Sequence, residues 1–447
     1  MTEADAFIEA ACVPLDGGHA SGMLDRANEI LKAHSEIATH SIHTAAILGD
    51  EVAVSRFLSV DKANATAKGG PRGWDALTHL CFSRYLRLDR ARSAGFVSAA
   101  RALLDAGASA NTGFFETNHQ PEPEFESALY GAAGVAHHEQ LTRLLLERGA
   151  NPNDDEVTYH TPEGYDLGAL EALVETGKLT PDSLATLLLR KADWHDLEGM
   201  TWLLEHGADP NHMTHWGLTA LHQAIRRDNA RRSIETMLNH GGDATPTTRA
   251  DGKTSVALAA RRGRRDLLDL FEQRGIRTDL HGIERLIAAC ARNDSASVHA
   301  IADGEPELVR QLVNEGGRLL AEFAGNGNSD GVGLLLDLGV DVAARFTDGD
   351  PYWSVAKDST ALHVAAWRAR HATVKLLIDR GAPVDVKDGG HRTPLALAVR
   401  ACVDSFWTDL RAPDSVEALL RSGASSDGVA FPSGYAEVDE LLRAHRR

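Results

Sequence analysis

The feature that most constrains this chain is a short helix pair, between Ser359 and Lys387, that cannot fold alone. The sequence predicts a first helix over Ala361–Arg368 and a second over Ala372–Arg380, which Gly381 ends. Glycine suits this end because it has no Cβ to clash in a left-handed conformation. The pair carries many apolar side chains, namely Leu362, Val364, Ala365, Val374, Leu376, Leu377 and Ile378. Such a unit can bury them only by stacking on copies of itself.

Further copies are present, because the helix-ending glycine recurs along the chain. It is found as Gly107, Gly149, Gly207, Gly241, Gly275, Gly339, Gly381 and Gly423. The steps from Gly207 to Gly241 and from Gly241 to Gly275 are 34 residues each, and the longer steps fit one repeat plus an insertion or two shortened repeats. The spacing therefore predicts an array of about ten helix pairs.

Short motifs recur at matching positions of these pairs. Thr219-Ala220-Leu221-His222 and Thr360-Ala361-Leu362-His363 open first helices, and Gly149-Ala150-Asn151-Pro152-Asn153 closes a second helix. In these motifs, over roughly residues 39 to 427, the chain resembles the ankyrin-repeat family, whose signature is Thr-Pro-Leu-His. The resemblance implies an all-α fold, an ankyrin-repeat solenoid of stacked helix-turn-helix units with helical caps at both ends. It says little about function, because a fold does not fix a site.

The domain division that we predict follows this array. It has an N-terminal helical cap (1–38), repeats with long hairpin-side insertions at 112–126 and 154–166 and an extra helix (39–210), further repeats (211–427) and a C-terminal capping helix (428–447).

Composition narrows the classes of partner and compartment. A net charge of −18 argues against nucleic acid as the general partner, and no run of 18 apolar residues predicts a membrane span. The four cysteines are scattered without a CxxC pair, which predicts a reducing compartment and a cytoplasmic location. No Cys-His or HExxH spacing is present, so we expect no metal and no cofactor.

The resemblance implies a concave groove formed by the hairpin tips and the first helices. The positions seven and eight residues after the signature threonine face this groove, and they hold Arg226, Arg227, Arg261, Arg262, Trp367 and Arg368. A row of guanidinium groups suits the carboxylates of an acidic protein or peptide partner. The alternative is a set of solvated helix ends placed favourably near the helix C-termini.

The hairpin tips and the long connections are the second source of candidate binding residues. They carry Trp74, Phe114, Phe115, Asp155, Tyr159, His160, His215, Trp216 and Trp353. Aromatic residues mixed with acids and histidines are typical of a protein-binding hot spot or of a pocket for a polar small molecule. We expect any ligand site to lie near the connections 112–126 and 154–166.

Two functional hypotheses remain open at this stage. The first is a binding module whose arginine- and aromatic-lined groove holds an acidic protein or peptide. The second is an enzyme or small-molecule binder with a site among residues 112–126, 154–166 and 205–218, where carboxylates and histidines would perform acid–base chemistry of a hydrolase or lyase. No catalytic residue is assigned, because the sequence does not give the separation of these groups.

Overall fold

A computed structural model describes residues 2–116, 118, 121–277 and 279–445 of the chain. Over these residues the chain consists of short helices in antiparallel pairs with a few two- to four-residue strands, which confirms the predicted all-α solenoid. By their contacts, residues 1–227 with 236–243 form a first unit, and residues 228–235 with 244–447 form a second.

The first unit begins with the predicted N-terminal helices and continues through the repeats up to residue 227. Its helices are α1 (Glu3–Ala11), α2 (Asp25–Ala33), α3 (Ile42–Ile47), α4 (Glu51–Val60), α5 (Ala76–Cys81), α6 (Arg84–Leu88), α7 (Ser93–Asp105), α8 (Ala128–Tyr130), α9 (Glu139–Glu147), α10 (Asp155–His160), α11 (Gly168–Glu175), α12 (Pro181–Asp193), α13 (Leu197–Glu205) and α14 (Ala220–Arg226). Between α7 and α8, β1 (Gly113–Glu116) pairs antiparallel with β2 (Glu124–Ser127). Helical turns join these elements at η1 (Ser35–Thr39), η2 (Lys62–Ala65), η3 (Arg90–Arg92), η4 (Gly131–Val135) and η5 (Thr161–Glu163).

Helix α15 (Arg231–Asn239) spans the division, and the second unit continues from it. Its helices are α16 (Ser255–Arg261), α17 (Arg265–Gln273), α18 (Ile283–Arg292), α19 (Ser295–Gly304), α20 (Pro306–Asn314), α21 (Gly316–Gly325), α22 (Ser329–Asp337), α23 (Ala361–Trp367), α24 (His371–Asp379), α25 (Pro394–Asp404), α26 (Asp414–Arg421) and α27 (Ala436–His445). The strands β3 (Arg345–Phe346) and β4 (Ser359–Thr360) pair before α23, and short turns occur at η6 (Pro351–Trp353) and η7 (Thr408–Leu410).

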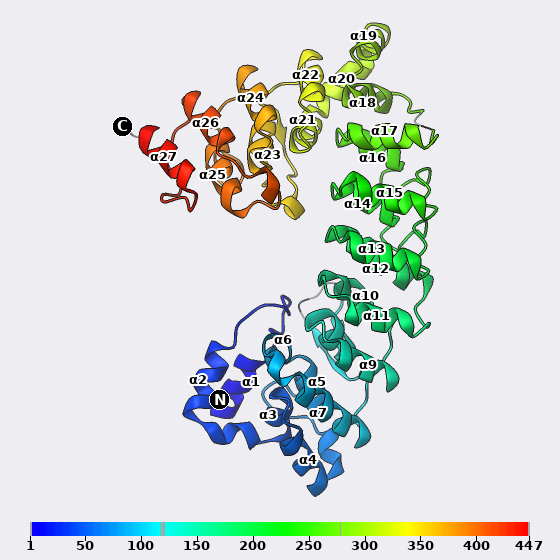
Figure 1. Cartoon of the computed structure of the whole chain (residues 1–447), viewed down its shortest axis with the longest axis vertical. Coiled ribbons are helices and arrows are strands. Elements are labelled where there is room, and N and C mark those ends of the chain that lie inside the picture. The colour runs from blue at the N-terminus through cyan, green and yellow to red at the C-terminus, as the bar shows by residue number, and fades with distance from the viewer. Residues whose placement is uncertain (1, 117, 119–120, 278, 446–447) are drawn as a thin grey trace. The chain divides into compact units, whose positions relative to one another are not determined.

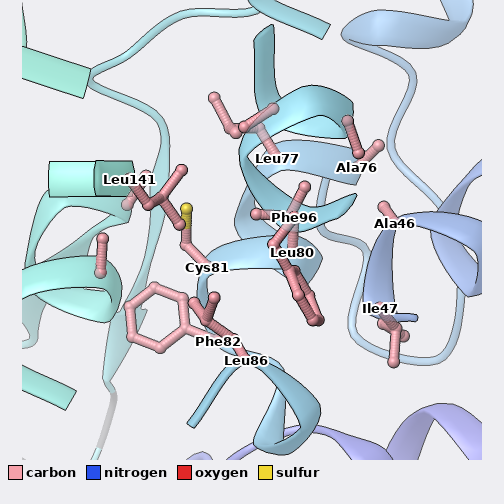
Figure 2. Close-up of a cluster of buried hydrophobic side chains, with 14 of the residues drawn as sticks. Ala46, Ile47, Ala76, Leu77, Leu80, Cys81, Phe82, Leu86, Phe96 and Leu141 are labelled. Carbon is pink, nitrogen blue, oxygen red and sulfur yellow. The ribbon is translucent and has the colours of Figure 1, made fainter. Parts of the chain in front are cut away.

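Each helix pair buries its apolar face against the next pair, as the sequence predicted. In the second unit, α21, α23 and α25 pack in one row, and α22, α24 and α26 pack in another (Figure 1). Figure 2 shows the same arrangement in the first unit, where Leu77 and Leu80 of α5 lie between Ile47 of α3 and Leu141 of α9. These four side chains have no measurable exposure.

The signature histidines tie neighbouring backbone segments together. In His363, Nδ1 accepts a hydrogen bond from the Thr360 amide at 3.1 Å, so Nε2 is the protonated nitrogen and donates to the Arg392 carbonyl at 3.1 Å. Burial lowers the pKa of His363 to about 4, so the ring stays neutral. His222 accepts from the Thr219 amide in the same way. These two imidazoles therefore have a structural role.

Asparagines in the turns after second helices join each turn to the next. The side chain of Asn211 donates to the Gly241 carbonyl at 2.9 Å and accepts from the Asp243 amide at 2.6 Å. Asn111 and Asn153 form the same two bonds to the turns that follow them. The Asn at this place of the turn motif thus holds successive turns of the first unit at a fixed spacing.

The prediction that residues 154–166 form a long connection is wrong. The segment contains α10 and η5, and α10 packs against α12, while α11 packs against α9. Together α10 and α11 are a helix pair of the array, so α11 is the second helix of a repeat and not an extra one. This pair could not be recognised from the sequence because α10 is mostly polar. Its buried residues are only Val157 and Thr158. The connection 112–126 exists, and it contains the β1–β2 hairpin.

Two further expectations can be compared with the described residues. All four cysteines are buried and free, in agreement with the absence of a disulfide framework. Among the helices of these residues, none is both long enough and apolar enough to cross a bilayer.

The asparagine bridges yield a first prediction. Replacing Asn211 by Ala removes two hydrogen bonds between turns and should lower the free energy of unfolding by about 1–2 kcal/mol, measured by urea denaturation. Asn314→Ala, at an exposed position of α20, is the matched control and should be neutral or slightly stabilising. Equal stability of the two variants would show that the bridges contribute nothing.

Candidate functional site

The β1–β2 hairpin has two different faces. Phe114 lies opposite Glu126 in the register, so Phe114, Glu116 and Glu126 share one face because strand side chains alternate. Phe115 and Phe125 lie opposite each other on the other face, with ring centroids 5.1 Å apart. One face is therefore mixed aromatic and acidic, and the other is an aromatic pair.

An aromatic cleft of about 560 Å³ opens beside the hairpin. Trp74 stacks on Phe114 at 4.4 Å between ring centroids, and both are almost fully buried, whereas Phe115 is 63% exposed. The residues lining the cleft are Leu15, Lys68, Arg72, Gly73, Trp74, Asp75, Asn111, Thr112, Gly113, Phe114, Phe115 and Phe125. The structure thus brings three predicted site residues, Trp74, Phe114 and Phe115, to one cleft.

A buried polar cluster lies behind the hairpin, around His19. Nδ1 of His19 is 3.0 Å from the Tyr130 hydroxyl, and Nε2 is 3.6 Å from Oε2 of Glu116. Oε2 of Glu126 lies 3.9 Å from Nδ1. The His19 ring is enclosed by aromatic rings, with centroids 5.7 Å from Tyr130 and 6.0 Å from Phe114. This cluster joins a segment before α2, the hairpin and α8.

The electrostatics of this cluster are unusual. Burial, with the carboxylates of Glu156 and Glu116, raises the pKa of Glu126 to about 9. Burial and the charge of His160 lower the pKa of His19 to about 4. At neutral pH the cluster therefore holds a neutral imidazole and a carboxyl group that keeps its proton.

His160, a predicted site residue on α10, lies between two carboxylates. Its Nε2 is 3.1 Å from Glu156 and its Nδ1 is 2.9 Å from Glu163. Burial lowers the pKa of His160, but these two carboxylates outweigh burial and raise it to about 9. Glu163 also pairs with Arg190 of α12 at 2.9 Å. His160 is thus a cation fixed between neighbouring helix pairs.

Three further predicted residues gather on the surface next to His160. The Tyr159 ring lies 5.7 Å from that of Trp216, and the guanidinium of Arg190 covers Tyr159 at 3.8 Å. The ring of His215 contacts that of Trp216 at 3.7 Å, and His215 pairs with Asp182. In contrast, Asp155 is exposed in the first turn of α10.

Most of the buried polar cluster carries no recognisable signal in the sequence. His19 lies in a stretch without repeat character, and Tyr130 and Glu126 look like ordinary residues of a repeat boundary. The alternation Glu124-Phe125-Glu126, read as a strand, was the one available signal for an acidic inner face. The cluster has groups for proton transfer, namely a protonated carboxyl, a phenol and a neutral imidazole. However, the described lining of the cleft includes none of these groups.

The predicted arginine row is largely paired with carboxylates of the same chain. Arg227 binds Asp193 at 2.7 Å, and Arg261 binds Glu284 at 2.7 Å. Arg226 is exposed. A partner would have to compete with these internal carboxylates.

Two members of the row, Arg262 and Arg368, lie in the interior of the second unit. Arg262 donates to Asp228 at 2.6 and 2.5 Å and lies 3.1 Å from Glu322, and Arg368 donates to Asp228 at 2.8 Å. Asn326 also donates to Asp228, at 3.0 Å. Burial raises the pKa of Asp228, but the two guanidinium groups outweigh burial and hold it well below its usual range. The expectation that Arg262 and Arg368 face a groove is therefore wrong.

Trp353 and Trp367 belong to the same interior. The Trp367 indole donates to the Trp353 carbonyl at 2.6 Å, and the Arg368 guanidinium lies 5.1 Å from the Trp353 ring and 4.3 Å from that of Trp407. Trp353 is 7% exposed and Trp367 is 6% exposed. They are core residues that cover the buried ion cluster, so their predicted place on a binding surface is also wrong.

Comparison with known proteins agrees with this architecture. A family model described as "Ankyrin repeats (3 copies)" matches residues 188–281 and 276–427, together more than half of the chain. The human protein "Ankyrin repeat and SOCS box protein 6" is 26% identical over 234 residues, which cover 50% of this chain and 46% of that protein. "Serine/threonine-protein kinase 12" of Arabidopsis thaliana is 41% identical over 85 residues, 19% of this chain and 17% of that protein.

The chain thus spans less than half the length of these curated relatives. Among solved structures, the crystal structure of the human ASB11 ankyrin repeat domain aligns with 66% of this chain and 98% of that chain, at 20% identity and a TM-score of 0.24.

The position of His160 predicts a pH dependence of stability. Because its pKa is raised, its ion pairs contribute fully below pH about 6.5 and are lost as the pH rises through about 9. The free energy of unfolding of the unmodified protein should fall between these pH values. In His160→Gln this fall should be smaller by about 1–2 kcal/mol, measured by urea denaturation. The exposed His281→Gln is the control and should keep the slope of the unmodified protein. An unchanged slope in His160→Gln would contradict the ion pairing.

The buried ion cluster predicts a large loss of stability. Asp228→Asn keeps the side-chain shape and tolerates the positive φ of 54°, but it removes the carboxylate that Arg262 and Arg368 share and leaves Glu322 as the acidic partner of Arg262. We expect a loss of about 3–5 kcal/mol in the free energy of unfolding. Asp337→Asn breaks the exposed pair with Arg380 and should cost less than about 1 kcal/mol. Similar values for both variants would show that burial does not strengthen the cluster.

Proposed function

Because this chain belongs to the ankyrin-repeat family, we propose that it is a protein-binding module whose aromatic cleft, beside the β1–β2 hairpin, holds an apolar side chain of its partner. Protein binding is typical of the family. The position of the contact is inferred from the aromatic residues of the first unit and from their exposure.

The observation that carries this proposal is the aromatic pair on the outer face of the hairpin. Phe115 is 63% exposed and contacts Phe125, and both line a cleft whose buried side is the stacked pair of Trp74 and Phe114. Burial of an exposed phenyl group from water stabilises a complex by about 1.5–3 kcal/mol. Aromatic side chains at the centre of an interface contribute a large share of binding energy. The cleft therefore offers a buried aromatic floor and an exposed aromatic rim.

The partner segment that we propose is acidic next to its apolar anchor. Lys68 lines the cleft and is exposed, so it can pair with a carboxylate of the partner. Arg72 also lines the cleft, but its guanidinium forms an ion pair with the carboxylate of Glu9 at 2.9 Å. The attraction of Lys68 for the partner acts at short range, because the net charge of −18 repels an acidic partner at a distance.

A second candidate function is the binding of a small polar molecule at the surface formed by Tyr159, His215 and Trp216. The observation that favours it is the fixed cation His160 beside these rings. The aromatic cleft is the stronger candidate, because it is a cavity of about 560 Å³ with an exposed apolar rim. A thermal-shift screen of metabolites on Trp216→Ala and the unmodified protein tests the second candidate.

The proposed contact predicts a loss of binding on removal of one ring. Phe115→Ala should reduce the affinity for protein partners at least about tenfold, because the partner's anchor loses its apolar rim. Its thermal stability should stay nearly constant, since Phe115 is exposed. Proximity labelling with quantitative mass spectrometry identifies the partners, and their affinities are then measured by titration with purified proteins.

The control is Phe431→Ala, which removes an exposed phenyl group from the second unit and should keep the partners of the unmodified protein. Lys68→Glu should weaken binding of the same partners, and the affinity of the unmodified protein should fall as salt rises. If Phe115→Ala retains full affinity, the aromatic cleft is not the contact. If binding is independent of salt and of Lys68, the partner segment is not acidic.

A further inference from the structure

The His19 cluster contains buried polar atoms without a hydrogen-bond partner. Nε2 of His19 and Oε2 of Glu126 are both inaccessible to solvent, and neither has a hydrogen-bond partner among the described residues. His19 is 5% exposed and Glu126 is 1% exposed. An unpaired buried polar atom costs about 1–3 kcal/mol, so two of them in one place require an explanation.

The two atoms face a third ligand-type group, the carboxylate of Glu116. One nitrogen or oxygen atom from each of His19, Glu116 and Glu126 lies within 4.8 Å of the other two. Nε2 of His19 is 3.6 Å from Oε2 of Glu116. Two ligands of one metal ion, each about 2.1 Å from it, lie about 3.0–3.4 Å apart. Nε2 of His19 and Oε2 of Glu116 are close to this spacing, and the carboxylate of Glu126 completes the set by moving inward.

We propose that His19, Glu116 and Glu126 bind a divalent metal ion that joins the segment before α2 to the β1–β2 hairpin. The site lies behind the aromatic cleft and is separate from the proposed partner contact. It departs from our expectation from sequence that the chain binds no metal. That expectation rested on motif spacing, which cannot detect ligands that are 97 residues apart, as His19 and Glu116 are.

The ligand set selects a class of metal ion. One imidazole nitrogen and two carboxylate oxygens suit zinc and its first-row neighbours, whereas calcium and magnesium prefer oxygen ligands alone. A water molecule would complete a tetrahedral site. Glu116 keeps 15% of its side chain exposed, so ions can reach the site from the hairpin side.

Tyr130 supports the imidazole in the orientation that a metal requires. Its hydroxyl lies 3.0 Å from Nδ1 of His19, and when Nδ1 donates this hydrogen bond the lone pair of Nε2 points toward Glu116. Ligating histidines usually donate their second ring nitrogen to such a group. Phe82 and Phe114 enclose the ring at 6.2 and 6.0 Å and keep it in place.

The test is zinc titration of the full-length chain after removal of metals with EDTA and dialysis. Isothermal titration calorimetry should show one high-affinity zinc ion per chain. Zinc should also raise the melting temperature by several degrees at 100 times Kd, and EDTA should reverse the shift. Glu126→Gln keeps the side-chain shape, and we expect it to weaken zinc binding at least tenfold and to reduce the shift in melting temperature to about half or less at the same zinc concentration.

The matched control is Glu124→Gln, on the same strand but outside the group of three, which should bind zinc within twofold of the unmodified protein. His19→Gln provides a second variant if Glu126→Gln does not fold, and it should show the same loss. The proposal is overturned if zinc leaves the melting temperature unchanged, which would mean that the two carboxyl groups only share a proton. It is also overturned if zinc binds Glu126→Gln or His19→Gln with full affinity, or if Glu124→Gln weakens binding as much as Glu126→Gln does.

Discussion

Burial of apolar side chains between neighbouring helix pairs is the interaction on which the rest of this structure depends. A pair such as α3 and α4 is too short to be stable in water, and its buried residues are covered by the next pair. Because each pair is fixed by its neighbours, the hairpins and caps at its ends are fixed as well. The array is therefore a scaffold that holds the polar and aromatic groups of its hairpins and caps in fixed positions.

In the first unit, this scaffold buries polar groups, although the burial of polar groups is unfavourable in itself. His19 lies among the rings of Phe82, Phe114 and Tyr130. Glu126 is buried beside it, where a charged carboxylate is costly. Of these rings, Phe114 also lines the aromatic cleft, where it stacks on Trp74. The hairpin thus separates an apolar surface, which suits a protein partner, from a polar interior, which suits an ion.

The repeats were predictable from sequence because they rest on local signals, namely a capping threonine, a closing glycine and apolar residues at helical spacing. The pair α10–α11 was not predicted because its first helix is short and polar. The site was predictable only in part. Trp74, Phe114 and Phe115 were selected because aromatic residues in connections are unusual, and they line one cleft in the structure. Arg262 and Arg368 were misplaced. Their counter-charge, Asp228, is far away in sequence, so nothing local distinguishes a buried guanidinium from an exposed one.

The pairing of Arg368 with Asp228 has a consequence for how the second unit acquires its structure. The two residues are 140 positions apart, and Asn326, which donates to the same carboxylate, is 98 positions from it. A repeat array usually has only neighbour contacts, so it can fold from any point and be shortened one repeat at a time. Here α16 also contacts α21 directly, although α17 to α20 intervene in the chain. The second unit should therefore have the slow, all-or-none folding of a globular domain. A fragment that ends before α23 would lose Arg368, one of the two guanidinium groups that neutralise the buried Asp228.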